Sequence, residues 1–69
     1  MNETQIRALF KGYLYLLQRN GHCEANLPQS DFLLMREFVK KCNYTTSEGN
    51  ADNALNVHVD GKTIKIGGY

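Results

Sequence analysis

The segment LNVHVDGKTIKI, residues 55–66, decides the fold because it encodes a β-hairpin together with its register. Asp60-Gly61 is a preferred pair for a two-residue type I′ turn, whose two positions both need positive φ. Closing the chain there sets the cross-strand pairs, which are Val59 with Lys62, Val57 with Ile64, and Leu55 with Ile66. The predicted hairpin, residues 54–66, therefore has an apolar face. A two-stranded ribbon is marginal in water, so other parts of the chain must cover that face.

The opposite face of the predicted hairpin is polar. It carries Asn56, His58, Thr63 and Lys65. Both edges of an isolated hairpin also present unpaired backbone groups. The polar face and the two edges are therefore candidate contact surfaces.

Residues 3–19 have the spacing of an amphipathic helix, with apolar residues recurring every three or four positions. These residues are Ile6, Leu9, Phe10, Tyr13, Leu14, Leu16 and Leu17. Asn2 and Gln5 have the spacing of a capping box, and Gly21 can end the helix in a left-handed conformation. Gly12 lies in the interior, where it costs up to about 1 kcal/mol relative to Ala. It either lets another element approach closely or is a tolerated surface glycine.

A second helix is predicted over residues 28–42, after a short connection at 22–27. Pro28 suits the first turn of a helix, although Ser30 could equally cap a helix that begins at Asp31. The predicted apolar side consists of Phe32, Leu34, Met35, Phe38, Val39 and Cys42. Two helices joined by so short a connection should pack antiparallel.

Residues 43–53 are rich in Asn, Thr, Ser, Gly and Asp, a composition typical of a loop. The predicted fold is therefore α+β, with two antiparallel helices packed on a C-terminal two-stranded hairpin. A chain of 69 residues forms one small domain, residues 1–69, with a thin core.

Composition indicates which partners and which cellular compartment to expect. The net charge of +1 and the isoelectric point near 7.8 give only weak long-range attraction to polyanions. No apolar stretch approaches the ~20 residues needed to cross a bilayer, so no membrane association is expected. The chain shows no export signal, and its two cysteines are expected to be reduced in a cytoplasmic setting.

Neither a metal site nor a catalytic motif is recognisable. His22, Cys23, Cys42 and His58 are numerically a zinc ligand set, but structural zinc sites usually use close pairs such as Cys-x-x-Cys. A phosphate-binding glycine loop and the common hydrolase motifs are missing as well. We therefore expect a protein that is not an enzyme and that needs no cofactor.

Large side chains expected at the surface favour protein binding. Tyr15 and Leu33 are expected on exposed helix faces, and Tyr44 is expected in the loop. Together with the polar face of the hairpin, these residues are the predicted partner-binding set. The leading hypothesis is a non-catalytic module that binds another protein or a second copy of itself. An inhibitor from a phage or mobile element and a small regulatory subunit would both fit. A homodimer joined through the hairpin edges is a further hypothesis.

The alternative is a nucleic-acid-binding protein. Its phosphate contacts would come from basic residues of the helices and the hairpin, namely Arg7, Lys11, Arg36, Lys40, Lys41, Lys62 and Lys65. Arg7, Lys11 and Tyr15 are predicted to follow one stripe of the first helix, where an aromatic ring could stack on a base.

Overall fold

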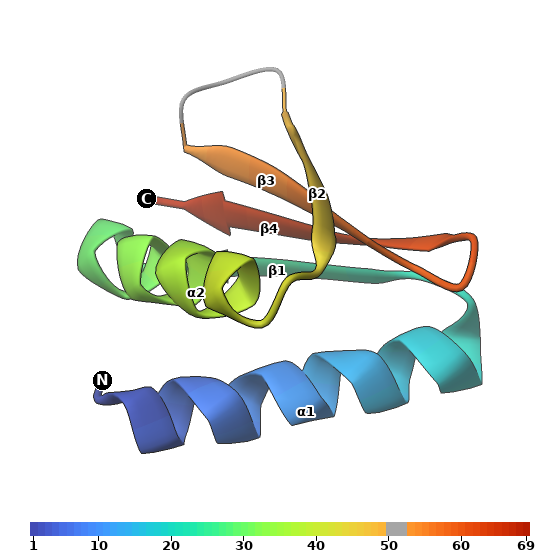
Figure 1. Ribbon diagram of the computed structural model, residues 1–69, viewed down its shortest axis with the longest axis horizontal. Helices are drawn as coiled ribbons and strands as arrows, with labels where there is room; N and C mark the ends of the chain where they lie inside the picture. The colour runs from blue at the N-terminus through green and yellow to red at the C-terminus, as the bar shows by residue number, and fades with distance from the viewer. Residues whose placement is uncertain (50–52) are drawn as a thin grey trace.

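The computed structural model describes residues 1–49 and 53–69 and shows two helices and a four-stranded mixed sheet (Figure 1). In chain order, the elements are α1 (Glu3–Asn20), β1 (Cys23–Leu27), α2 (Gln29–Lys41), β2 (Thr45–Glu48), β3 (Ala54–Val59) and β4 (Lys62–Gly68). The sheet has the order β1-β4-β3-β2, in which β1 is parallel to β4 and the other pairs are antiparallel. The α+β class is confirmed, but the predicted two-stranded sheet is wrong.

The hairpin is confirmed in detail. β3 and β4 pair in the predicted register, with Val57 opposite Ile64 and Leu55 opposite Ile66. Asp60 and Gly61 both have positive φ, 52° and 78°. The polar and apolar faces of this hairpin are therefore those that the sequence predicts.

Both edges of the hairpin are paired within the chain. β1 lies along β4 where a connection was predicted, and β2 lies along β3 where residues 43–53 were predicted to be a loop. Residues 50–52 of that predicted loop lie outside the described residues. The unpaired edges of the sheet are those of β1 and β2.

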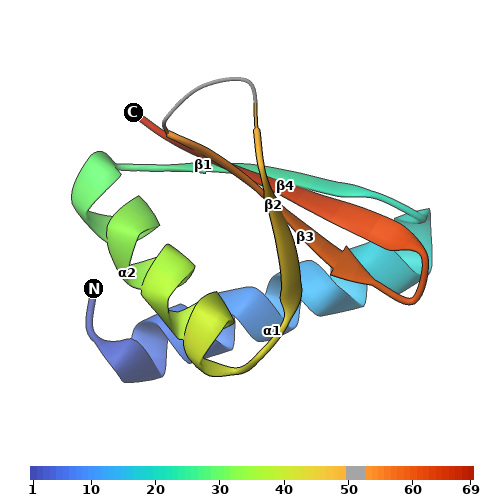
Figure 2. The same cartoon turned by 45° about the horizontal axis from the view of Figure 1, so that its top comes forward.

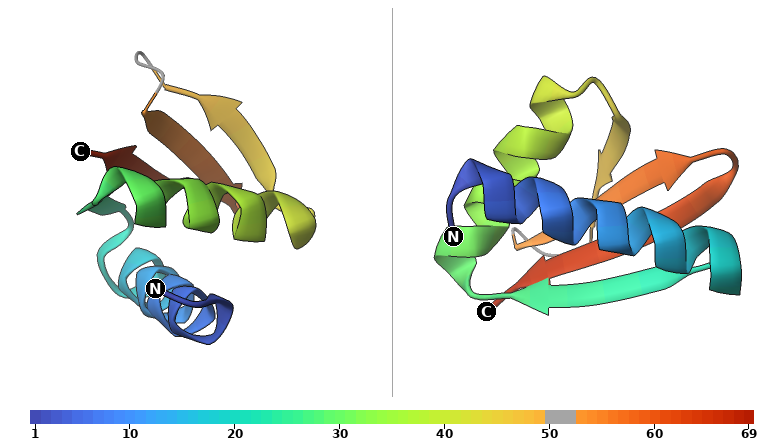
Figure 3. Two further views of the ribbon diagram at one scale, coloured as in Figure 1. Left: turned by 90° about the vertical axis from the view of Figure 1, so that its left-hand side faces the viewer. Right: turned by 90° about the horizontal axis from the view of Figure 1, so that it is seen from below.

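Both helices lie on the same face of the sheet, as Figure 2 and the left view of Figure 3 show, and both contact β1 and β4. The start of α1 has the predicted capping box between Asn2 and Gln5, and Gly21 ends it in the left-handed region with φ 81°. α2 crosses α1 steeply, so the predicted antiparallel packing is wrong (Figure 3). The cause is β1, which carries the chain back along the sheet before α2 begins.

The core fills the space between the helices and the sheet. It is formed by Ile6, Phe10, Tyr13, Leu17, Cys23, Leu27, Phe32, Met35, Phe38, Val39, Leu55, Val57, Ile64 and Ile66. Gly68 lets α2 approach closely, because a Cβ there would lie 3.0 Å from both Cβ and Cγ of Phe32. The predicted core residues Leu34 and Cys42 are exposed instead, and Cys42 lies beyond the last residue of α2.

Candidate functional site: two surfaces of opposite character

The face of the sheet that the helices leave uncovered is polar. It brings together four residues predicted to bind a partner, Asn56, His58, Thr63 and Lys65. The cross-strand register adds residues from the two strands that sequence reasoning missed, namely Glu24 and Asn26 of β1 and Thr45 and Ser47 of β2. We call these eight residues the open sheet face.

A chain of hydrogen bonds runs across three strands of the open sheet face. Nε2 of His58 lies 2.8 Å from Oγ of Ser47, and its Nδ1 lies 3.2 Å from Oγ1 of Thr63. A serine hydroxyl beside an imidazole is the start of a nucleophile and base pair, but the group behind this imidazole is a hydroxyl rather than a carboxylate. The bonds therefore fasten β2, β3 and β4 to one another.

The open sheet face is hollowed near one end of β4. The small residues Ala54 and Gly67 lie on its floor, and Glu24, Asn56 and Lys65 line it. Glu24 and Lys65, which are cross-strand partners, carry charges of opposite sign. This hollow offers a ligand both hydrogen-bonding groups and apolar surface, since Leu55 and Ile66 are also among its lining residues.

The helices carry most of the exposed apolar surface. The large apolar residues exposed among the described positions are Met1, Tyr15, Leu16, Leu33, Leu34 and Tyr69. Four of these six belong to α1 or α2, Met1 lies two residues before α1, and none belongs to the open sheet face. Leu33 and Leu34 are neighbours on α2, with 48% and 40% of their surfaces exposed.

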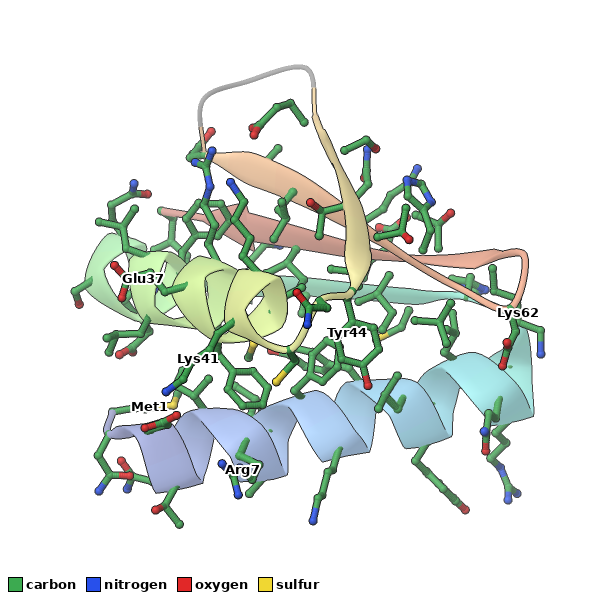
Figure 4. All side chains as sticks on the ribbon, viewed as in Figure 1. Met1, Arg7, Glu37, Lys41, Tyr44 and Lys62 are labelled. Carbon is green, nitrogen blue, oxygen red and sulfur yellow. The ribbon has the colours of Figure 1, made fainter. Side chains whose placement is uncertain are left out.

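A groove runs between the start of α1 and the second half of α2. Apolar groups of Ile6, Leu34 and Phe38 form its floor, while Glu3, Glu37 and Lys41 form its rim. Figure 4 shows Lys41 between α2 and the start of α1. The groove holds about 170 Å³. A cavity of about 150 Å³ can hold a benzene molecule, so this groove has room for one aliphatic side chain.

The groove is held in place by polar contacts between the two helices. Nζ of Lys41 lies 3.3 Å from Oε1 of Glu3, which joins the end of α2 to the start of α1. The N-terminal ammonium group of Met1 lies 2.9 Å from Oδ1 of Asp31. The two ion pairs thus link Met1 and Glu3 to the first turn and the last residue of α2.

The three large residues predicted to bind a partner lie apart from the open sheet face. Tyr15 is exposed on α1, where Arg19 donates a hydrogen bond to its hydroxyl over 3.3 Å. Tyr44 is half-buried, with its ring edge-on to Phe10 at a centroid distance of 5.0 Å. Leu33 does not line the groove itself, but it lies on α2 one helical turn before Glu37 of the groove rim.

The basic residues of the nucleic-acid hypothesis are spread over several elements. Figure 4 shows Arg7 on the side of α1 away from the sheet and Lys62 at the turn of the hairpin. Lys11 lies one turn beyond Arg7 on α1, Lys40 lies on α2, and Lys65 lies on β4. Two others are neutralised, since Arg36 pairs with Glu48 at 2.8 Å and Lys41 pairs with Glu3. The structure thus places Arg7 and Lys11 on one side of α1 and distributes the other predicted residues over α2, β4 and the hairpin turn.

The thiols are separated. Cys23 is buried, and its burial, with a smaller effect of Glu24, raises the pKa of its thiol above the ordinary value. Cys42 is exposed at the end of α2. Among residues 1–49 and 53–69, no three histidine, cysteine or acidic side chains are grouped as metal ligands would be.

Comparison with known protein families, curated protein sequences and solved structures gave no match to this chain. In the part of the chain that the structure describes, neither helix has the length and apolar character needed to cross a bilayer. Functional inference therefore depends on the residues and surfaces of the chain itself.

Proposed function

We propose that this protein is a non-catalytic protein-binding module that docks its partner on the helices, with the groove between α1 and α2 at the centre of the contact. The supporting observation is the groove itself, an apolar floor of Ile6, Leu34 and Phe38 inside a charged rim. Binding energy at protein interfaces concentrates where an apolar side chain fills such a pocket and a polar rim excludes water.

The energetics of the groove favour such an anchor. Burying one aliphatic side chain contributes about 1.5–3 kcal/mol, and here the receiving surface is already formed. Ile6 and Phe38 are held by the core, with 1% and 8% of their surfaces exposed. The groove therefore needs little ordering when a partner binds, which lowers the entropic cost of association.

The neighbouring surface extends the same contact. Leu33 lies one helical turn before Glu37 of the rim, and Met1 lies two residues before α1, so two further exposed apolar side chains belong to the segments that form the groove. An inhibitor that covers part of a target and a subunit that stays bound to an enzyme would both use such a patch. A homodimer could use it too, or could add strands at the free edges of β1 and β2.

Site-specific photo-crosslinking tests this proposal. A benzoylphenylalanine placed at Leu33, and one placed at Asn56 on the open sheet face, would be irradiated in cells of the native source. We expect one defined protein adduct from position 33 and none from position 56, because only the first position lies beside the groove.

Leu34→Asp should abolish the adduct at position 33, while Asn56→Asp should leave it unchanged. Both sites are at the surface, and circular dichroism would verify that both variants fold. An adduct from position 56 alone would refute the proposal, as would an adduct at position 33 that survives Leu34→Asp.

A further inference from the structure

From the charges around the groove, we infer that its occupant is a protein segment in which an aliphatic side chain is accompanied by a lysine or arginine. This inference rests on the proposed function, because it names the chemistry of the segment that docks there. The aliphatic side chain would enter the groove, and the basic side chain would pair with Glu37 at the rim.

The rim has an excess of negative charge. Glu3, Glu37 and Lys41 together carry two carboxylates and one ammonium group, a net charge of −1. The ammonium group of Lys41 is engaged by Glu3 at 3.3 Å. Glu37 has no ion pair within residues 1–49 and 53–69. One carboxylate therefore remains available to a cation from a partner.

The position of Glu37 makes a contact beside the anchor feasible. Glu37 lies on α2 one residue before Phe38 and three residues after Leu34, so its side chain stands over the same helix turn as the apolar floor. A partner residue that fills the floor brings its neighbours to this rim. A carboxylate in the partner would instead meet Glu37 with like charge, which disfavours acidic segments.

The expected contribution of the charge is modest, because the rim is open to solvent. Exposed ion pairs give about 0.2–1 kcal/mol, a factor of about 1.4 to 5 in affinity. The aliphatic side chain provides most of the affinity, and the charge selects among segments that contain one. Salt should weaken the charge-dependent part without removing the apolar part.

Titration of the ¹⁵N-labelled full chain with three blocked dipeptides tests the inference. The probes are N-acetyl-Leu-Arg-amide, N-acetyl-Leu-Glu-amide and N-acetyl-Ala-Arg-amide, and the readout is the backbone amide shifts of Ile6, Leu34 and Phe38. We expect the Leu-Arg probe to shift these amides at the lowest concentration. The Ala-Arg probe should be weakest, since it cannot fill the groove.

Glu37→Gln should reduce the affinity for the Leu-Arg probe by a factor of about 1.4 to 5 and leave that for the Leu-Glu probe equal or higher. The matched control is Glu24→Gln, an exposed carboxylate on the open sheet face, which should change neither affinity. Equal binding of the Leu-Arg and Leu-Glu probes, or an unchanged affinity in Glu37→Gln, would overturn the inference.

A failure of the inference about the occupant can be distinguished from a failure of the proposed function. If none of the three probes shifts the groove amides, the inference is wrong, while the adduct at Leu33 still reports whether a protein docks on the helices. The absence of any adduct at position 33 when the groove residues are unchanged would refute both.

Discussion

The open sheet face and the outer surface of the helices are both exposed, but they differ in whether apolar side chains are among those exposed to water. On the sheet, the alternation of the strands separates apolar from polar residues, so Ile64 is buried and its neighbour Thr63 binds His58. On the helices, apolar side chains remain outside, as Leu33 and Leu34 show. Single apolar residues are common on a solvated surface, but Leu34 also lines the groove at which we propose that a partner docks.

The strongest test of this difference compares two adjacent residues of β4. Ile64→Ala should lower the free energy of unfolding by about 2–5 kcal/mol, because it removes a fully buried side chain and leaves a cavity. Thr63→Ala should cost at most about 1.5 kcal/mol, since it removes only one side-chain hydrogen bond on the open face. Urea denaturation of both variants measures the contrast. Similar costs would mean that the two faces are not distinct in the folded protein.

A smaller effect is expected at Gly12, in the middle of α1. A Cβ there would meet no heavy atom within 4 Å, so no other element of the described chain approaches it. Gly12→Ala should therefore raise the free energy of unfolding by up to about 1 kcal/mol through helix propensity alone. Thermal denaturation measures it, with Ala8→Gly on the same exposed side as a control expected to have the opposite sign. A destabilised Gly12→Ala would show that something packs against this side of α1.

The smallest expected effect is a decline of stability at alkaline pH, which distinguishes the buried thiol from the exposed one. Burial raises the pKa of the Cys23 thiol in the folded protein, and burial likewise raises the pKa of Tyr13, with a smaller contribution from Cys23. The unfolded chain therefore loses these protons first as pH rises. Stability is full below the unfolded pKa of the thiol, about 8.5, and declines as pH rises through the raised pKa of the folded state.

Urea denaturation at pH 7.5 and at pH 10 measures this decline. Cys23→Ser should make it shallower, although Tyr13 would preserve part of it. The exposed thiol supplies the control, since Cys42→Ser should leave the decline as it is in the unmodified chain. An unaltered decline in Cys23→Ser would show that this thiol does not contribute to the alkaline loss of stability.

The elements with strong local signals were predictable from the sequence. Asp60-Gly61 determines the turn and therefore the register of β3 and β4, and Asn2, Gln5 and Gly21 determine the ends of α1. Each of these signals acts over a few residues. The hairpin and both helices were therefore identified, with bounds that differ from the structure by one or two residues.

The two edge strands were missed for a physical reason. Glu24, Ala25 and Asn26 of β1 have low strand propensity, and β1 is stabilised by pairing with residues about 40 positions away. Its alternation of Cys23 and Leu27 inward with Glu24 and Asn26 outward was the available signal. β2 has no large apolar residue. It is held by pairing with β3 and by the ion pair between Arg36 and Glu48.

The candidate site was only partly predictable. Leu33 was identified as exposed, but Leu34 was assigned to the core. The groove depends on how steeply α2 crosses α1, and that angle follows from the missed strand β1. The helical spacing of apolar residues predicts Glu37 on the polar side of α2. Its position beside Ile6 depends on how the two helices pack, which the sequence pattern does not give.

The parallel pairing of β1 with β4 also has a kinetic consequence. Cys23 meets Ile64 and Leu27 meets Gly68, so this pairing closes a loop that includes α2, β2 and β3. The entropy of closing a long loop must be lost before its contacts form, whereas β3 and β4 meet across a two-residue turn. The hairpin should therefore form early in folding and β1 should dock late. Weakening β1 should then accelerate unfolding more than it slows folding, and local opening of the sheet should begin at its first strand.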